Sequence, residues 1–187
     1  MTPYYKLRNY KVMSTPHLMS QEVPPLVVRR NEAEVLGTGA NTISLLADVP
    51  ATGGFLSVTR TTLGKGQDGA APHYHCASAE TFFVLGGVLQ VLIGVEIVTA
   101  REGDLLFVPP RTVHAFGAAP GFGADLLIAF TPGVERFGYF RLLDRVRNGD
   151  AGPGEVLDTQ ERYDNHFVDS TVWREARRAG LPETTHA

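Results

Sequence analysis

The chain has 187 residues, of which 43% are hydrophobic and 20% are charged, and this size and composition are typical of one globular domain with a single core. A net charge of -3 gives no general attraction to nucleic-acid phosphates or anionic lipids. We therefore expect a small-molecule substrate, no nucleic-acid partner and no membrane partner. The single cysteine excludes an internal disulfide and favours a reducing, cytoplasmic location.

Residues 1–25 lack the continuous apolar stretch of a secretory signal, and we expect them to form an N-terminal arm that is partly disordered. From residue 26 to residue 131, short apolar or alternating runs are separated by Gly, Pro and Asp. Their length and spacing predict the strands of an all-β domain, an antiparallel sandwich or barrel. The expected strands are residues 26–30, 43–47, 55–63, 81–85, 88–93, 96–100, 105–108 and 126–130.

The pattern changes after residue 131, and we expect residues 132–187 to form a C-terminal helical extension. Apolar residues at intervals of three and four predict an amphipathic helix that ends near Gly149 and packs outside the barrel. Two further helices are predicted at residues 156–163 and 170–178, the second with Ser170 as its N-cap.

The stretch PHYHCASAE, residues 72–80, sets two histidines one residue apart and a glutamate five residues after the second. Residues i and i+2 of a strand project from the same face, so His73 and His75 point together into the barrel. A short turn then brings Glu80 to the start of the next strand. Because a carboxylate among apolar side chains needs a counter-charge, these three side chains are candidate metal ligands.

A second motif supplies another imidazole. The segment GDLLFVPPRTVHAF, residues 103–116, predicts a turn, a strand, a proline-containing turn and a short strand that carries His114. This strand would bring His114 to the same interior. Three of the six histidines thus lie in two strand-edge motifs, which is not the distribution of scattered surface histidines.

Together these motifs resemble those of the cupin superfamily. The first cupin motif is matched by His73, His75, Glu80 and Gly87, and the second by Gly103, Pro109 and His114. The sequence departs from the motifs at Gln67 and Arg111, where glycine is usual, and at Ala118, where asparagine is frequent. None of these departures removes a motif histidine or the glutamate.

The resemblance implies a conical cupin β-barrel of the jelly-roll, double-stranded β-helix type, commonly assembled as a homodimer. It also implies that one divalent metal is bound by His73, His75, Glu80 and His114. Three imidazoles and one carboxylate suit Fe, Mn, Ni or Co, and Zn is possible. The alternative is a polar core network of the same four residues without metal.

Among cupins, the sequence is similar to single-domain quercetin 2,3-dioxygenase-like members. That similarity implies a metal-dependent oxygenase acting on a small aromatic, enol or polyketide-like substrate, with Glu80 as both ligand and catalytic base. One alternative is a cyclase, isomerase or lyase that uses the same metal only as a Lewis acid. Another is a cupin that binds a small molecule without catalysis.

Other side chains near the motifs have simpler explanations. Strand alternation turns Cys76 outward, away from any activating base, and Arg60, Arg111 and Tyr74 are expected on the rim or in salt bridges. The aromatic residues Phe82, Phe83, Phe107 and Phe116 are expected to be mostly core. Those on the inward face would suit a planar, largely apolar ligand.

Overall fold

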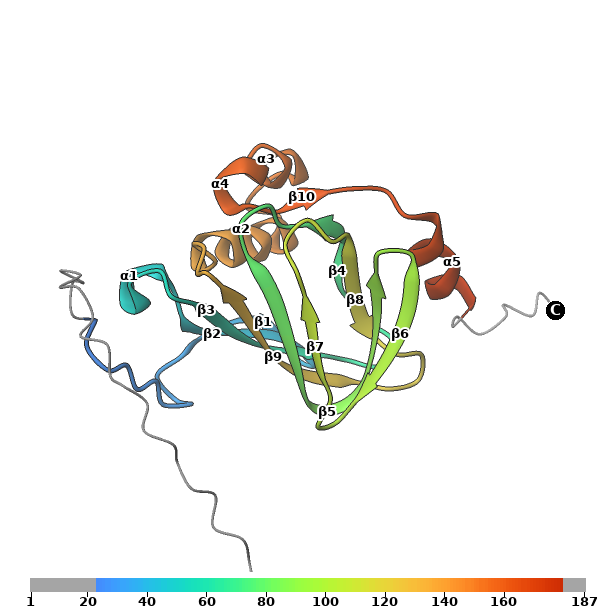
Figure 1. Cartoon of the computed structure of the whole chain (residues 1–187), viewed down its shortest axis with the longest axis horizontal. Helices are drawn as coiled ribbons and strands as arrows, with labels where there is room; N and C mark the ends of the chain where they lie inside the picture. Colours follow the sequence, from blue (N-terminus) through green and yellow to red (C-terminus); the bar gives the residue numbers. More distant parts are fainter. Residues whose placement is uncertain (1–22, 180–187) are drawn as a thin grey trace, which may run out of the picture.

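The computed structural model of the chain describes residues 23–179, so the expected N-terminal arm lies almost entirely outside the described residues. Within these residues, ten strands form one curled antiparallel sheet, and α2 to α5 come after β9 in the chain (Figure 1). The strands are β1 Glu34–Thr38, β2 Asn41–Ala47, β3 Ser57–Leu63, β4 Asp68–Tyr74, β5 Ala79–Ile93, β6 Glu96–Arg101, β7 Leu105–Val108, β8 His114–Ala118, β9 Ala124–Thr131 and β10 His166–Phe167. The helices are α1 Val49–Thr52, α2 Phe137–Asn148, α3 Pro153–Leu157, α4 Gln160–Tyr163 and α5 Thr171–Ala179.

The strands enclose an apolar interior, which confirms the expected all-β class with a helical C-terminal part. Their order in the sheet is β1-β2-β3-β9-β5-β8-β4-β10, and β6 and β7 both pair with β5. Burial alternates along β3 and along β9, as expected when one face of a strand is turned to the core. The main cluster contains Phe82, Val84, Leu89, Val91, Leu126, Ile128 and Phe130.

Strand β5 connects the two halves of the curled sheet. Its first half pairs with β7 and β9, and its second half pairs with β6 and β8. Two separate strands, 81–85 and 88–93, were expected here, and that prediction was wrong. The chain bends at Gly87, which has a φ of 77° and where a Cβ would lie 2.0 Å from the Gly123 carbonyl oxygen. Glycine allows the strand to bend there and continue.

The prediction of a strand at residues 26–30 was also wrong. The segment is irregular, with Leu26 48% and Val27 65% exposed. It follows two prolines, and proline cannot donate a backbone hydrogen bond to a sheet. The first strand is instead β1, which pairs with β2 through a tight Gly-containing turn.

The helical part begins where the buried Asp48 carboxylate accepts hydrogen bonds from the backbone N–H groups of Arg136 and Phe137. Helix α2 ends at Asn148 with Gly149 as its C-cap, close to the predicted end. The single helix expected over residues 156–163 is two short helices, α3 and α4. Ser170 precedes α5 and accepts a hydrogen bond from the Trp173 N–H, which confirms its capping role.

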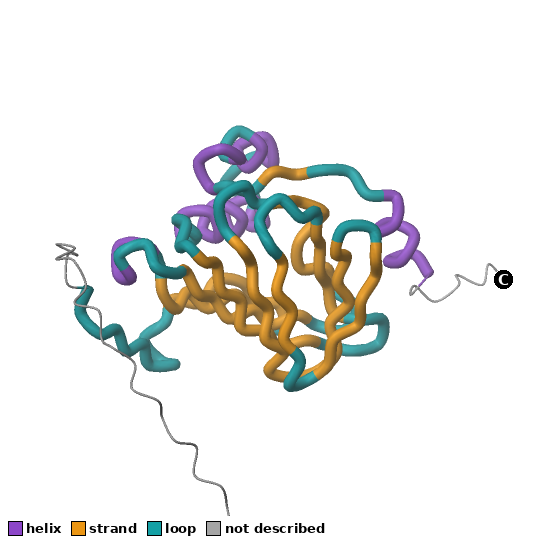
Figure 2. The backbone as a smooth tube through the Cα atoms, viewed as in Figure 1, coloured by secondary structure: helices purple, strands orange, loops and turns teal. Residues whose placement is uncertain are grey.

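The helical part returns to the barrel after α4. Strand β10 pairs with β4 in the register His166 to Tyr74 and Phe167 to His73. Figure 2 shows α2, α3 and α4 gathered along one side of the strands, and α5 lies apart from them. No helix within residues 23–179 is long and apolar enough to cross a membrane.

Candidate metal centre

The structure brings His73, His75, Glu80 and His114 together inside the barrel. His73 is on β4, His75 directly follows it, Glu80 is near the start of β5 and His114 begins β8. Antiparallel pairing of β4 with β8 sets His73 directly opposite His114. All four residues are at most 3% exposed, and their potential ligand atoms lie within 4.8 Å of one another.

The Glu80 carboxylate is the point on which the three imidazoles converge. Its Oε2 lies 2.6 Å from His114 Nε2, 3.1 Å from His75 Nε2 and 3.9 Å from His73 Nε2. The three Nε2 atoms therefore face one small volume next to one carboxylate oxygen.

The other ring nitrogen of each histidine fixes the proton position. Each Nδ1 lies against a backbone carbonyl oxygen, which can only accept a hydrogen bond, so each Nδ1 carries the hydrogen. The pairs are His73 with Ala71 at 2.8 Å, His75 with Asp164 at 2.5 Å and His114 with Thr112 at 2.9 Å. In the neutral rings, Nε2 then presents a lone pair to the cluster.

This arrangement fits a metal ion. Three Nε2 lone pairs and a carboxylate are all acceptors, so the cluster needs a cation between them, either a proton or a metal. Backbone carbonyls that accept from Nδ1–H are the usual means of orienting metal-bound histidines. The cluster could therefore hold one divalent metal through three nitrogens and one oxygen.

The electrostatics of the cluster pair Glu80 with His114. Burial alone would raise the pKa of the Glu80 carboxyl, but its contacts with His114 and His75 hold that pKa well below its usual value. Burial alone would lower the pKa of His114, but its contact with Glu80 raises it. Burial lowers the pKa of His73 well below its usual value. Glu80 and His114 therefore each favour the charged form of the other.

A buried arginine that the sequence motifs do not identify lies against the cluster. Arg136, at the start of α2, is 1% exposed, and its Nη1 donates to the Tyr163 carbonyl at 3.1 Å. Its guanidinium carbon lies 4.0 Å above the Phe130 ring, and its Nη2 lies 2.9 Å from His75 Nδ1. Because that Nδ1 already carries a hydrogen, the guanidinium packs against the ring without donating to it. Burial lowers the pKa of Arg136.

The turn after α4 supports the histidine loop. Asp164 has a φ of 47°, its carbonyl accepts from His75 Nδ1, and its carboxylate accepts from the N–H groups of Cys76 at 2.6 Å and Ala77 at 2.9 Å. Burial opposes ionisation, but these backbone hydrogen bonds lower the pKa of Asp164. One residue of the C-terminal part thus orients both a candidate ligand and the loop that carries it.

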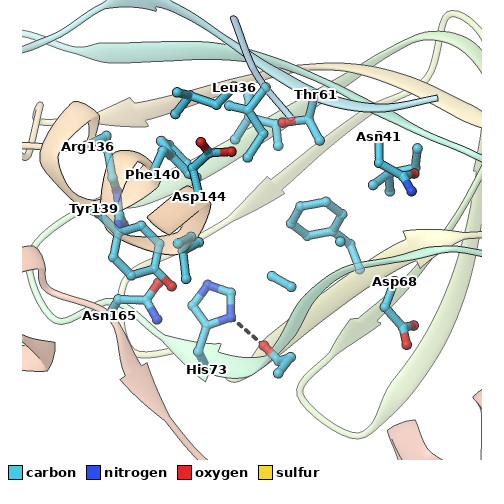
Figure 3. A pocket seen from close by; sticks show the side chains of 18 of the residues that line it. Leu36, Asn41, Thr61, Asp68, His73, Arg136, Tyr139, Phe140, Asp144 and Asn165 are labelled. Carbon is cyan, nitrogen blue, oxygen red and sulfur yellow. Dashed lines mark hydrogen bonds between the residues drawn. The ribbon is translucent and has the colours of Figure 1, made fainter. Parts of the chain in front are cut away.

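A cavity of about 400 Å³ opens onto the cluster. Its wall includes His73 and Glu80 from the cluster. Arg136, Tyr139 and Asn165 from the C-terminal part also line it (Figure 3). Most other lining side chains are apolar, among them Ile43, Phe116, Ile128, Phe130, Phe140 and Phe167. Burial raises the pKa of Tyr139 to about 12, so its hydroxyl keeps its proton at neutral pH. A ligand in this cavity would touch both the cluster and helix α2.

The remaining candidate polar residues do not line this cavity. Arg60 pairs with Asp125, Tyr74 stacks on His166 at 5.0 Å between ring centroids, and Cys76 is exposed as expected. Arg111 has a φ of 63°, at the position where the cupin motif has glycine, so the turn keeps the glycine conformation.

The aromatic residues divide between the two faces of the sheet. Phe82 and Phe116 are buried, but Phe83 is 38% and Phe107 is 60% exposed, so the prediction that this set is mostly core was wrong for these two. Both side chains lie on the outer face of β5 and β7. In the pairing of these strands, Thr81 lies opposite Phe107 and Phe83 lies opposite Leu105. They contribute nothing to the cavity.

Comparison with known proteins agrees with the fold and the motifs. Residues 59–127, which contain all four cluster residues, match the protein-family model described as "Cupin domain". No curated protein matches the chain. Residues 59–127 therefore match a cupin domain, in agreement with the fold.

Three solved structures illustrate the likeness. KdgF from Halomonas sp. is 19% identical with a TM-score of 0.51, and the match covers 62% of this chain and 98% of that one. A protein described as a predicted oxalate decarboxylase from Thermotoga maritima is 19% identical with a TM-score of 0.51, covering 57% and 99%. Streptomyces Pac13, a nucleoside dehydratase solved with uridine, is 20% identical with a TM-score of 0.47, covering 58% and 83%. At these identities the likeness concerns the fold alone and does not single out a quercetin dioxygenase.

Proposed function

We propose that the protein is a cytoplasmic, metal-dependent cupin oxygenase that acts on a small aromatic, enol or polyketide-like substrate. The observation that carries this proposal is the convergence of three Nε2 lone pairs and the Glu80 carboxylate at the wall of a largely apolar cavity. A divalent metal bound by His73, His75, Glu80 and His114 would supply Lewis acidity and, where redox-active, a means of activating O2.

The side chains around the cluster have separate tasks in this proposal. Apolar residues such as Phe116 and Ile128 hold the body of the substrate and exclude water. Glu80 lines the cavity, so its carboxylate can receive the proton of a substrate enol or phenol. Because His114 and His75 keep the pKa of Glu80 low, that proton must come from a group whose acidity the site has raised.

The first test is metal content. Protein purified without added metal should contain about one divalent ion per chain by elemental analysis, and His114→Ala should contain almost none. Asp125→Ala is the control, since Asp125 pairs with Arg60 outside the four-residue cluster. Wild-type protein that takes up no divalent metal, even when metal is supplied, contradicts the proposal.

The second test separates an oxygenase from the other cupin functions. Oxygen uptake is measured with flavonols and related enols, aerobically and anaerobically, on wild type and Glu80→Gln. Uptake that depends on both metal and substrate supports the oxygenase. Turnover without O2, or equal turnover with zinc, replaces it with a Lewis-acid cyclase, isomerase or lyase, and binding without turnover replaces it with a binding protein.

We also propose that the protein is a homodimer that pairs through the outer face of β5 and β7. Phe83, Leu105 and Phe107 are exposed there and are neighbours in the strand register. Adjacent exposed apolar side chains of this size commonly mark an interface. Sedimentation should give a dimer for wild type and a monomer for Phe107→Glu, while a wild-type monomer at micromolar concentration rejects this assembly.

A further inference from the structure

Two buried hydrogen-bond donors in the cavity wall have no partner. Within residues 23–179, three buried side-chain polar atoms lack a hydrogen bond: Arg136 Nε, Asn165 Nδ2 and Thr59 Oγ1. Arg136 and Asn165 line the cavity and are 1% and 4% exposed, whereas Thr59 does not line it. Buried donors are almost always paired, so two unpaired donors in one cavity point to a ligand that accepts from them.

The charge of Arg136 points to the same kind of ligand. Among the described residues, its guanidinium makes no ion pair, and its neighbours are the Phe130 ring, the His75 ring and the Tyr163 carbonyl. The other arginine that lines the cavity, Arg147, is already paired with Asp144. Buried cations are normally paired. Arg136 is thus a buried cation of the described cavity wall that no carboxylate pairs.

We infer that Arg136 and Asn165 form an anion subsite that binds a carboxylate of the substrate beside the metal centre. Figure 3 shows the two residues on the same side of the cavity, with Tyr139 between them. A planar guanidinium matches the two oxygens of a carboxylate, and the amide of Asn165 adds a further donor. The rest of the wall is largely apolar, so the substrate class is a small carboxylic acid with an aromatic or aliphatic body.

This inference rests on the proposed function in one respect, the presence of a metal beside the subsite. The test below therefore measures acid binding with and without metal. Benzoate, cinnamate and 2-naphthoate are each titrated calorimetrically against the corresponding neutral amide. The titrations use both chelator-treated and zinc-loaded protein. An acid that binds the chelator-treated protein more tightly than its amide is held by protein donors and not by metal.

The expected result is that at least one acid binds the chelator-treated wild type about 10-fold or more tightly than its amide, the gain typical of charged hydrogen bonds. Arg136→Gln and Asn165→Asp should each lose this preference, the second by setting a negative charge beside the anion. Arg136→Lys should keep part of it. Arg147→Gln is the matched control and should keep all of it.

Three results would overturn the inference: no acid bound, acids and amides bound equally, or the preference retained in Asn165→Asp. Thermal unfolding of each variant shows whether it is folded, and if Arg136→Gln is not, the near-isosteric Asn165→Asp decides. A wild type that takes up no metal but still prefers acids would refute the proposed metal-dependent function and leave the subsite supported.

Discussion

The barrel and the C-terminal part contribute opposite chemistry to one cavity. The barrel supplies acceptors, namely the Nε2 atoms of its histidines and the Glu80 carboxylate. The C-terminal part supplies donors and a positive charge, from Arg136, Asn165 and the Tyr139 hydroxyl. The difference indicates that metal binding and substrate selection are carried by separate segments of the chain, so each should be removable without the other.

The largest expected effect is on the barrel side. His114→Ala removes one candidate ligand and leaves the buried Glu80 without its closest partner. Metal affinity should be measured by competition with a chromogenic chelator. It should fall by more than about 100-fold, because the loss of a group that only orients a ligand costs up to roughly that much. The variant should still bind acids more tightly than amides in calorimetric titrations. Loss of this preference together with the metal would show that metal binding and acid binding are not separable.

A smaller effect should follow from the contact that joins the two regions. Asp164→Ala removes the carboxylate that holds the Cys76 and Ala77 N–H groups and so loosens the loop carrying His75. We expect metal affinity to fall by about 10-fold, at the low end for such orienting groups. Asp169→Ala, which alters an exposed carboxylate of the same segment, is the control. Equal affinities for the two variants would mean that the loop is rigid without Asp164.

The pH dependence of stability should reverse with metal. Glu80 raises the pKa of His114 in the folded protein above the value of about 6.5 in the unfolded chain. In chelator-treated protein, the His114–Glu80 pair therefore stabilises the folded state fully below pH 6.5. This stabilisation is lost as the pH rises through the folded pKa. The unfolding temperature should therefore fall by a few degrees from pH 6.5 upward. With metal it should rise over the same range, because fewer protons compete for the ligands. A rise in both forms would contradict the raised pKa of His114.

The smallest effect is expected at the outer rim of the barrel. Arg60 and Asp125 form a partly exposed ion pair that does not line the cavity. Arg60→Gln should change the free energy of unfolding by less than about 1 kcal/mol and leave metal and acid binding unaltered. Denaturant unfolding and the same calorimetric titrations measure both, and weakened acid binding would extend the subsite to Arg60.

The sequence could predict the barrel part because its determinants are local. Alternation places His73 and His75 on one face, and the apolar runs mark most strands within a few residues of their ends. It could not predict that β5 passes through Gly87 unbroken, because that depends on the close approach of Gly123. Nor could it find Arg136 beside His75, since 61 residues separate them and the contact exists only after the tail has folded back.

The two-residue strand β10 has a consequence for how the protein behaves in a crowded solution. It pairs with β4, which would otherwise be the last strand of the sheet and would present unpaired backbone groups along the strand that carries His73. Such free edges recruit strands from other molecules and start aggregation. The tail that supplies the cavity donors therefore also protects the barrel from self-association through this edge.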